Sequence, residues 1–411
     1  ANMLETVNIY YEGWGERWLL GTLAHGRGEL LFEYSPQALA QKLELSPIKL
    51  PLQVAAFSRF PQAQWGLPGL VADSLPDGWG MLLMDRYFRK NGVEVSTLSA
   101  LDRLTFLGHR TMGALTFEPA QAMATPAGTV DLLALAQQAQ QVMAGKDSAL
   151  LAQLVQMGGS PHGARPKVLV DYCVATGEMG TQGVANGQPW LVKFPSQGEH
   201  KEVCAIENCY AALARDCGLD VPATQYFDIA PQLAGFGIAR FDVDNGMRVP
   251  VHTLAGAMNA DFRLPGALDY LTFLRVTRNL TRDAREVEKG FARAVFNVVF
   301  NNRDDHPKNF SFRLDRERHW KLSPAYDLTY SPGPGGYHQM DVMGEAQTIT
   351  RKNMLELAHR ADISVAKASA HLDRHLAVAG DFAKTLKAAK VRPTTIQHLA
   401  AQVVANVDRL K

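Results

Sequence analysis

The sequence predicts an α+β fold with two lobes, in which a β-rich first part is followed by a mostly helical last part. Two observations lead to this fold class. Short stretches of alternating apolar and polar residues, separated by turns with Gly or Pro, occur in residues 4–35 and 167–242, as in antiparallel strands. Longer apolar patterns with helical spacing occur in residues 269–301 and 354–411.

Length and composition limit the possible functions. The 411 residues are enough for two or three domains or one large bilobed unit. The net charge of +1 predicts no large basic face for nucleic acid. Because no long apolar run and no signal-peptide pattern is present, we expect no membrane contact and a cytoplasmic location. The four cysteines include no C-x-x-C, which favours reduced core thiols over a metal site or disulfide.

We expect three parts, namely a β-rich subdomain at 1–122, a middle region at 123–245 and a helical region at 246–411, with a linker at 119–128. The first part should contain strands at 7–9, 18–23, 30–34 and 114–117 and helices at 81–90 and 98–107. The middle part should contain helices at 130–144, 149–157 and 203–217 and strands at 167–175, 189–195, 225–229 and 236–242. The last part should contain helices at 269–276 and 287–301, a β-hairpin with its tip at 315–319, and helices from 354 onward.

A polar segment, Asn301–Asn309, lies between a predicted apolar helix and an apolar strand. Polar groups in such a place are costly unless they are paired or take part in chemistry. Asp304 precedes Asn309 by five residues, which is the spacing of the protein-kinase catalytic loop H-R-D-x-x-x-x-N. In that role Asp304 is the catalytic base for a substrate hydroxyl, and Asn309 supplies an oxygen ligand for Mg²⁺.

Four further residues belong to this hypothesis. Lys308 either neutralises phosphate charge or pairs with Asp305. His306 is either a metal ligand or, as we favour, an orienting hydrogen-bond partner. Asp327 follows the hairpin, where a kinase has the metal-binding Asp of D-F-G, although the local sequence Tyr-Asp-Leu also suits an ordinary turn or helix-cap Asp.

The other half of a kinase site is expected in the middle region. Residues 158–167 form a glycine-containing loop before a strand, which is either a plain turn or a loop whose backbone approaches phosphate. Lys193 is a lone cation in an apolar strand, either an edge-strand lysine facing solvent or the lysine that binds nucleotide phosphates. Glu207 on the next helix could pair with it, and Glu202 is an alternative that helix register does not exclude.

These features occur in kinase order, and together they resemble the HipA family of serine/threonine kinases, which are toxins of bacterial HipBA-type toxin–antitoxin modules. The resemblance is carried by Arg-Asp-Asp-His-Pro-Lys-Asn-Phe-Ser at 303–311, Pro-Ala-Tyr-Asp at 324–327, Gly-Gly-Ser-Pro-His-Gly-Ala-Arg-Pro-Lys at 158–167 and Leu-Pro-Asp-Gly at 75–78. Lipid kinases of the phosphatidylinositol type share a related D-x-H-x-x-N loop, so the glycine loop and the match over nearly the whole chain select the family. The implied fold is bilobed and protein-kinase-like, related to the phosphatidylinositol-kinase fold.

The resemblance implies ATP and Mg²⁺ as cofactors, with Asn309 and Asp327 as metal ligands. It implies a hinge for adenine at 239–241, and autophosphorylation of Ser160 that ejects the glycine loop. The residues expected to bind ATP are Ser160, Gly163, Lys193, Glu207, Ala239, Phe241, His306, Lys308, Asn309 and Asp327.

The resemblance also implies partners. Family substrates include translation proteins such as an aminoacyl-tRNA synthetase, and the partner is a small helix-turn-helix antitoxin, HipB-like, through which alone the kinase meets operator DNA. This chain departs from the common loop pattern at Pro161 and at His162, which replaces a Gly, so the substrate need not carry over.

Two other classes of function are compatible with parts of the pattern. One is a nucleotide-binding regulatory protein without transfer activity, acting through an antitoxin–DNA complex, although all the catalytic positions are filled. The other is a metal-dependent hydrolase built on Asp304, Asp305 and His306, for which the sequence offers no second ligand cluster.

Overall fold

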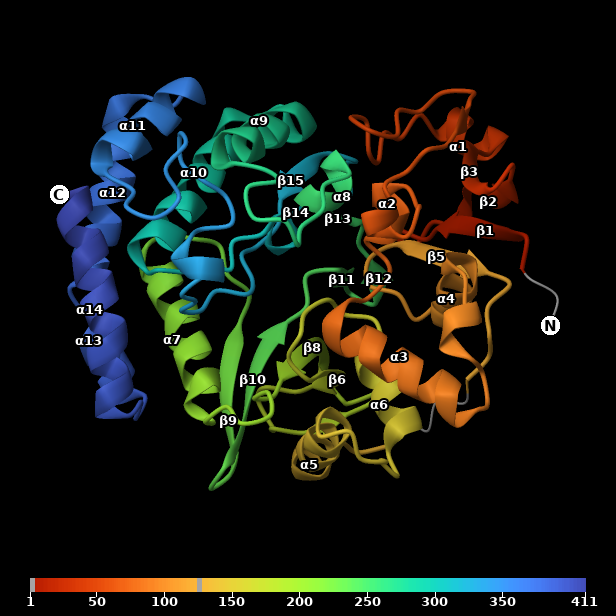
Figure 1. The fold of residues 1–411 in the computed structure, drawn as a ribbon, viewed down its shortest axis with the longest axis horizontal. Helices are drawn as coiled ribbons and strands as arrows, with labels where there is room; N and C mark the ends of the chain where they lie inside the picture. The colour runs from red at the N-terminus through yellow and green to blue at the C-terminus, as the bar shows by residue number, and fades with distance from the viewer. Residues whose placement is uncertain (1–3, 124–127) are drawn as a thin grey trace. The chain divides into compact units, whose positions relative to one another are not determined.

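A computed structural model describes residues 4–123 and 128–411 (Figure 1). The chain divides into two compact units, which we describe one at a time. The first contains the residues up to Lys201 together with 225–252 and 256–259. The second contains 202–224, 253–255 and 260–411. Residues 124–127 of the expected linker lie outside the described residues.

The first unit begins with a five-stranded sheet in the order β4-β3-β2-β1-β5. Its neighbours pair antiparallel, and alternate residues of β1 (Val7, Ile9 and Tyr11) are fully buried, as the period-2 pattern predicts. The strands are β1 (Thr6–Tyr11), β2 (Trp18–Gly26), β3 (Glu29–Tyr34), β4 (Ala56–Phe57) and β5 (Leu115–Glu118). The helices of this region are α1 (Pro36–Gln41), α2 (Gly69–Ala72), α3 (Gly78–Lys90) and α4 (Ala100–Leu107).

A second sheet of the first unit has the order β7-β6-β8-β10-β9. Strand β8 therefore has β6 on one side and β10 on the other, and Lys193 at its end is in register with Lys167 and Phe236. The strands are β6 (Lys167–Tyr172), β7 (Met179–Gly180), β8 (Gln188–Lys193), β9 (Thr224–Ala230) and β10 (Leu233–Ala239). Helices α5 (Leu132–Met143) and α6 (Leu151–Gly158) precede this sheet, and α6 packs against α3 (Figure 1).

The second unit is built around α10 (Ala284–Val299), whose residues are buried along most of its length. It packs against α9, α12 and α14, and Phe296 and Phe300 form an aromatic cluster with Tyr210 and Phe382. The elements of the unit are α7 (Glu202–Asp216), α9 (Tyr270–Thr281), the hairpin β14 (Ser311–Leu314) and β15 (Trp320–Leu322), α11 (Arg351–Arg360), α12 (Val365–Ala379), α13 (Phe382–Ala388) and α14 (Pro393–Leu410). Short elements β11 (Val243–Asp244), β12 (Met247–Arg248), β13 (Val251–Thr253) and α8 (Leu254–Met258) lie where the chain passes from the first unit to the second.

The predicted long elements are present with shifts of a few residues at their ends. Strand β7 lies between the two predicted strands at 167–175 and 189–195, and α9 extends to Thr281, five residues beyond its predicted end. The structure groups α7 with the second unit, and the division at 122 and 245 stays a prediction.

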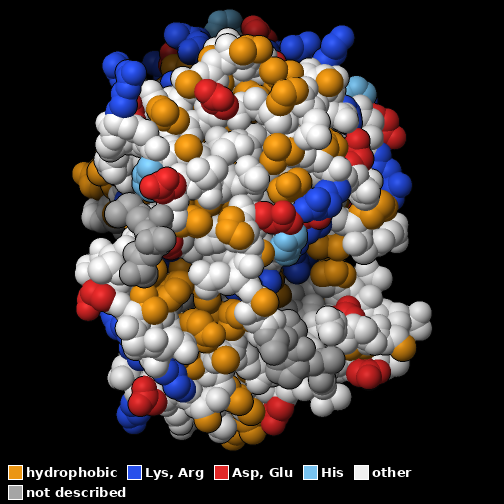
Figure 2. All heavy atoms as spheres, turned by 90° about the vertical axis from the view of Figure 1, so that its right-hand side faces the viewer, with side chains coloured by type: hydrophobic (Ala, Val, Ile, Leu, Met, Phe, Trp, Pro, Cys, Tyr) orange, Lys and Arg blue, Asp and Glu red, His pale blue; other side chains and the backbone are white. Residues whose placement is uncertain are grey.

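Composition-based expectations can also be compared with the structure. All four cysteines are buried free thiols. Within 4–123 and 128–411, no helix is long and apolar enough to cross a membrane. On the face drawn in Figure 2, basic and acidic side chains are interspersed among apolar ones, in keeping with the net charge of +1.

Candidate functional site

The polar segment after α10 is fixed by hydrogen bonds on both of its sides. Asn301 adopts a left-handed backbone conformation (φ +55°), which turns the chain out of the helix. Its amide donates to the Ser331 carbonyl at 3.1 Å and accepts from Asn406 at 3.1 Å. The Arg303 guanidinium donates to the carbonyls of Gly336 and Gln347. The hydrogen bonds of Asn301 and Arg303 thus offset part of the cost of burying these two side chains.

The two adjacent aspartates have opposite environments. Asp305 is 1% exposed, and its carboxylate accepts hydrogen bonds from the Tyr270 hydroxyl at 2.6 Å and the Gln339 N–H at 2.8 Å. His338 Nδ1 lies 2.7 Å from the same carboxylate. Burial, and then the charge of Asp305, raises the pKa of Tyr270 well above its usual value, so Tyr270 remains a donor. Asp305 thus serves as a structural anchor of the loop.

Asp304, in contrast, is accessible, with a side chain 53% exposed. Its Oδ1 accepts from Gln339 Nε2 at 3.1 Å and lies 3.9 Å from His306 Nε2. The His306 ring packs against Phe262 with 5.2 Å between ring centroids. At 3.9 Å the two atoms are too far apart for a hydrogen bond, so the interpretation of His306 as an orienting hydrogen-bond partner stays a prediction. Of the two neighbouring carboxylates, Asp304 is the one a substrate hydroxyl can reach.

Asn309 is oriented by the loop that carries it. Its amide nitrogen donates to the main-chain carbonyl of Asp304 at 2.7 Å, which leaves the amide oxygen as the group to face a cation. The Tyr326 hydroxyl contacts the Lys308 carbonyl at 2.7 Å and the Ser311 hydroxyl at 2.5 Å, one residue before and two after Asn309. Tyr326 therefore holds the ends of the turn, a role that sequence reasoning did not assign.

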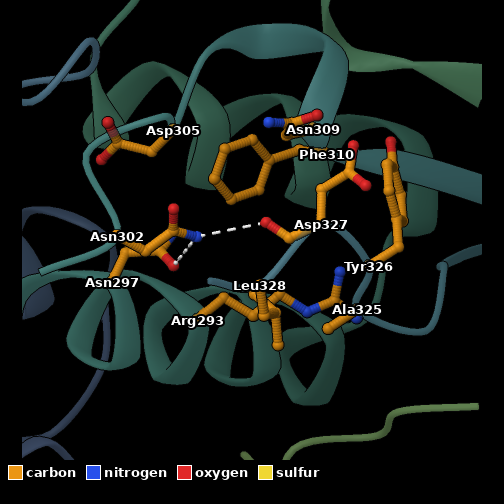
Figure 3. A pocket seen from close by; sticks show the side chains of 10 residues that line it. All are labelled: Arg293, Asn297, Asn302, Asp305, Asn309, Phe310, Ala325, Tyr326, Asp327 and Leu328. Atoms are coloured by element: carbon orange, nitrogen blue, oxygen red, sulfur yellow. Dashed lines mark hydrogen bonds between the residues drawn. The ribbon is translucent and has the colours of Figure 1, made fainter. Parts of the chain in front are cut away.

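The expected metal ligands Asn309 and Asp327 line the same pocket of the second unit (Figure 3). Asp327 has a left-handed backbone (φ +52°), and its carbonyl accepts from Asn302 at 3.4 Å. A strained non-glycine conformation persists only where its surroundings impose it, and such positions cluster at functional sites. The pocket is lined by Arg293, Asn297, Asn302, Asp305, Asn309, Phe310, Ala325, Tyr326, Asp327 and Leu328.

The chemistry of this pocket suits a hydrated Mg²⁺ ion. Asn309 and Asp327 offer the hard oxygen donors that Mg²⁺ prefers. Two buried polar atoms of the lining, Arg293 Nη1 and Asn302 Oδ1, have no hydrogen-bond partner within the described parts of the chain. Burial lowers the pKa of Arg293 to about 10, so it stays charged at neutral pH. Buried groups of this kind call for water or a polar ligand.

The structure shows contacts of two further residues, Lys308 and Glu202, that the predicted site includes. The Lys308 ammonium lies 4.2 Å from the centroid of the Phe262 ring, while Asp305 is held by the partners described above. Glu202, one alternative partner for Lys193, accepts from Arg392 Nη2 at 2.8 Å and Thr395 Oγ1 at 2.6 Å. Glu207, also on α7, is 3% exposed, and the pairing of Lys193 with Glu207 or Glu202 stays a prediction.

The order of strands in the second sheet of the first unit excludes one of the two interpretations of Lys193. Because β8 is an inner strand, the interpretation of Lys193 as an edge-strand lysine is wrong. Its ammonium lies 5.9 Å from the centroid of the Phe236 ring. The predicted hinge at 239–241 follows β10, and Arg240 in it forms a two-bond ion pair with the buried Asp242 at 2.9 Å.

The glycine loop joins α6 to β6 in the same unit. A Cβ atom on Gly158 would lie 2.2 Å from the Lys167 carbonyl oxygen, so the first glycine is required for the turn. Ser160 is 6% exposed. Lys167 is 3% exposed, and its ammonium donates to the His162 carbonyl at 2.5 Å. The loop is thus a tight, internally bonded turn that buries Ser160.

The predicted residues therefore form two sets, each described within its own unit. Ser160, Gly163, Lys193, Ala239 and Phe241 belong to the first unit, and Glu207, Asp304, His306, Lys308, Asn309 and Asp327 belong to the second. Among residues 4–123 and 128–411, no three or more His, Cys, Asp or Glu side chains are grouped to hold a metal ion.

Comparisons with known proteins place this arrangement in a family. The model of the HipA N-terminal domain matches residues 11–118, and that of the HipA-like C-terminal domain matches 159–409. A "Putative kinase" of Haemophilus influenzae is 30% identical over 167 residues, 36% of this chain and 48% of the relative. "Putative kinase Y4dM" of Sinorhizobium fredii is 32% identical over 155 residues, 34% of this chain. The matches span 48% and 37% of these curated relatives, less than half of each.

A solved structure agrees over nearly the whole chain. It is the complex of HipA, HipB and operator DNA from the toxin–antitoxin system of Shewanella oneidensis MR-1. The superposition has a TM-score of 0.70 at 16% identity and covers 98% of this chain and 97% of the other. This likeness confirms the predicted α+β fold. Because the C-terminal family model matches more than half of the chain, the protein belongs to the HipA family.

Proposed function

We propose that the protein is an ATP- and Mg²⁺-dependent protein serine/threonine kinase and the toxin of a HipBA-type toxin–antitoxin module. Family membership and the two curated relatives named as kinases support the reaction class. The observation that carries the proposal is the contrast within one loop. Asp304 is accessible beside His306, while Asn309 shares a pocket with Asp327.

Each residue has a role that its surroundings allow. Asp304 accepts or orients the proton of the substrate hydroxyl, Gln339 donates a hydrogen bond to its carboxylate, and His306 lies beside it. Asn309 and Asp327 hold Mg²⁺, which when bound neutralises charge on the phosphates. The glycine loop and Lys193 bind the phosphates, with Glu207 as the partner of Lys193, and the segment 239–241 contacts adenine.

Autophosphorylation of Ser160 requires a change in the glycine loop. A hydroxyl that is 6% exposed cannot enter another active site, so the loop must leave its buried position before Ser160 is modified. Phosphorylated Ser160 then keeps the loop out, because a group with nearly two negative charges does not return to a buried site. The kinase would thereby switch itself off.

The proposed partners follow from the family and from the solved complex. The substrate is a protein, for which a translation component such as an aminoacyl-tRNA synthetase is the first candidate. A small HipB-like helix-turn-helix antitoxin binds the kinase and carries it to operator DNA, by analogy with the Shewanella oneidensis complex of HipA, HipB and DNA. The proposed location is the cytoplasm.

The test is phosphoryl transfer from radiolabelled ATP by wild-type protein and Asp304→Asn. We expect the substitution to lower the rate by about 10²- to 10⁴-fold, the usual contribution of a positioned base. Its thermal unfolding should not change, because the side chain is 53% exposed. Asp408→Asn, at a site with a 62% exposed side chain on α14, is the matched control and should keep full activity.

Each contrary result points to another function. Full activity in Asp304→Asn would remove Asp304 from the role of base. Tight ATP binding by the wild type without a phosphoprotein product would favour the regulatory alternative. Binding of Mn²⁺ or Zn²⁺ without nucleotide would favour a metal-dependent hydrolase.

A further inference from the structure

Two residues at the start of helix α3 form hydrogen bonds to Gly163 in the glycine loop, one to its backbone N–H and one to its carbonyl. The carboxylate oxygen Oδ1 of Asp77 accepts a hydrogen bond from the Gly163 N–H at 2.5 Å. The Trp79 N–H donates to the Gly163 carbonyl at 3.0 Å. Further along, the Trp79 indole donates to the Lys167 carbonyl at 3.2 Å. The segment 77–80 thus contacts the loop at Gly163 and at Lys167, and all of these residues belong to the first unit.

The two backbones can approach this closely because glycines face each other. A Cβ atom on Gly78 would lie 2.7 Å from the Gly163 carbonyl oxygen, and one on Gly80 would lie 2.9 Å from the Gly159 carbonyl oxygen. Gly163 itself has φ +105°, a conformation that side chains disfavour. Any side chain at these positions would push the helix and the loop apart.

Asp77 differs from an ordinary helix cap. Asp131, at the same position before α5, accepts hydrogen bonds from the N–H groups of Leu133 and Ala134 in its own helix. Asp77 makes no such side-chain cap bond to α3. Its carboxylate is directed instead to Gly163, 86 residues away in the sequence. A helix that gives up its cap interaction in this way indicates a role outside the helix.

We infer that Asp77 is a positioning residue that braces the glycine loop, holding the peptide at Gly163 so that Ser160 stays buried. The brace lies in the region matched by the N-terminal family model, and the loop lies in the region matched by the C-terminal one. The N-terminal region is therefore part of the machinery that shapes the loop. The consequence for nucleotide binding rests on the proposed kinase function, and the brace itself does not.

Hydrogen–deuterium exchange of the full chain without nucleotide tests the brace directly. In Asp77→Ala, peptides that cover residues 159–166 should exchange at least about tenfold faster, because a hydrogen bond to a charged acceptor is lost. Asp77→Asn keeps an acceptor oxygen without the charge and should give an intermediate rate. Asp131→Ala is the matched control, in which the start of α5 should exchange faster while the glycine loop is unchanged.

Two results of this experiment would overturn the inference. If Asp77→Ala and Asp77→Asn leave loop exchange at the wild-type rate while the first amides of α3 exchange faster, Asp77 is an ordinary helix cap. If all regions exchange faster together, its role is global stability and the brace is rejected.

A kinetic measurement separates positioning from simple loss of folded protein. Loosening the loop should raise the KM for ATP several-fold and lower kcat less, because the loop binds phosphate without taking part in proton transfer. A merely structural role would lower kcat through the active fraction and leave the KM unchanged. Should the wild type transfer no phosphoryl group at all, the proposed function fails, whereas the exchange experiment still decides the brace.

Discussion

The glycine loop and the polar segment Asn301–Asn309 are held in place by different means. Around residues 158–167 the hydrogen bonds from the segment 77–80 join backbone atoms of the loop, and the glycines on both sides permit the close approach. Around Asn301–Asn309 the contacts are made by buried side chains, with Asp305 at their centre. A loop that offers N–H groups to phosphate must present bare backbone, whereas a base and metal ligands need side chains oriented by other side chains.

The same contrast occurs between two adjacent residues. Asp304 and Asp305 are adjacent in the sequence, yet the side chain of Asp304 is 53% exposed and that of Asp305 is fully buried. The two neighbouring carboxylates thus lie in different environments, so one of them can serve the reaction while the other anchors the segment. The loop therefore separates chemistry from stability at the level of single residues.

The largest effect on stability is expected for Asp305, the buried carboxylate that anchors the loop. This effect tests the contrast between Asp304 and Asp305. Asp305→Ala removes the acceptor shared by Tyr270, His338 and the Gln339 N–H and should lower the free energy of unfolding by about 3 kcal/mol. Urea denaturation measures this difference. Asp304→Ala should change stability by less than about 0.5 kcal/mol, as surface substitutions usually do. Equal losses for the two variants would show that both residues are structural.

The glycine loop should respond to a single added methyl group. In a helix, Ala is preferred to Gly by about 1 kcal/mol, which alone predicts that Gly158→Ala is stabilising. The added Cβ would lie 2.2 Å from the Lys167 carbonyl oxygen, and we expect this clash to win by about 2 kcal/mol. Thermal unfolding checks the sign. Gly128→Ala, where no atom lies within 4 Å of the added Cβ, should be close to neutral.

Acid should weaken the second unit through its carboxylates. Burial favours a higher pKa for Glu202, but hydrogen bonds from Arg392 and Thr395 outweigh it and lower the pKa to about 2. Because the folded pKa lies below the unfolded one, this stabilisation is present above about pH 4.5 and is lost as the pH falls toward 2. Between pH 6 and pH 3 it should shrink by roughly 2 kcal/mol.

The measurement for this effect is the free energy of unfolding of wild-type protein minus that of Glu202→Gln at several pH values. Gln does not titrate, so the difference isolates the single carboxyl group. A difference that is independent of pH from 6 to 3 would show that Arg392 and Thr395 do not hold Glu202 in solution.

Long elements and local spacings were predictable because their signals lie within a few residues. The apolar spacing of α10 and α7 predicts both helices, and Asp304 and Asn309 are only five residues apart. Short elements such as α2 and β13 were not predicted, because four or fewer residues do not establish a period. Leu-Pro-Asp-Gly at 75–78 was visible as a motif, yet no local signal connects Asp77 with Gly163.

The order of the elements, the family and the candidate base could thus be derived from the chain itself, since periodicity, spacing and turn residues are local properties. The tertiary structure alone distinguished the two carboxylates, placed β8 inside its sheet, and brought Tyr326 and Asp77 to the two loops. These features depend on burial and on hydrogen bonds between residues far apart in the sequence. The polar segment Asn301–Asn309 could be recognised from its own residues, whereas the contacts that hold it and the glycine loop in place could not.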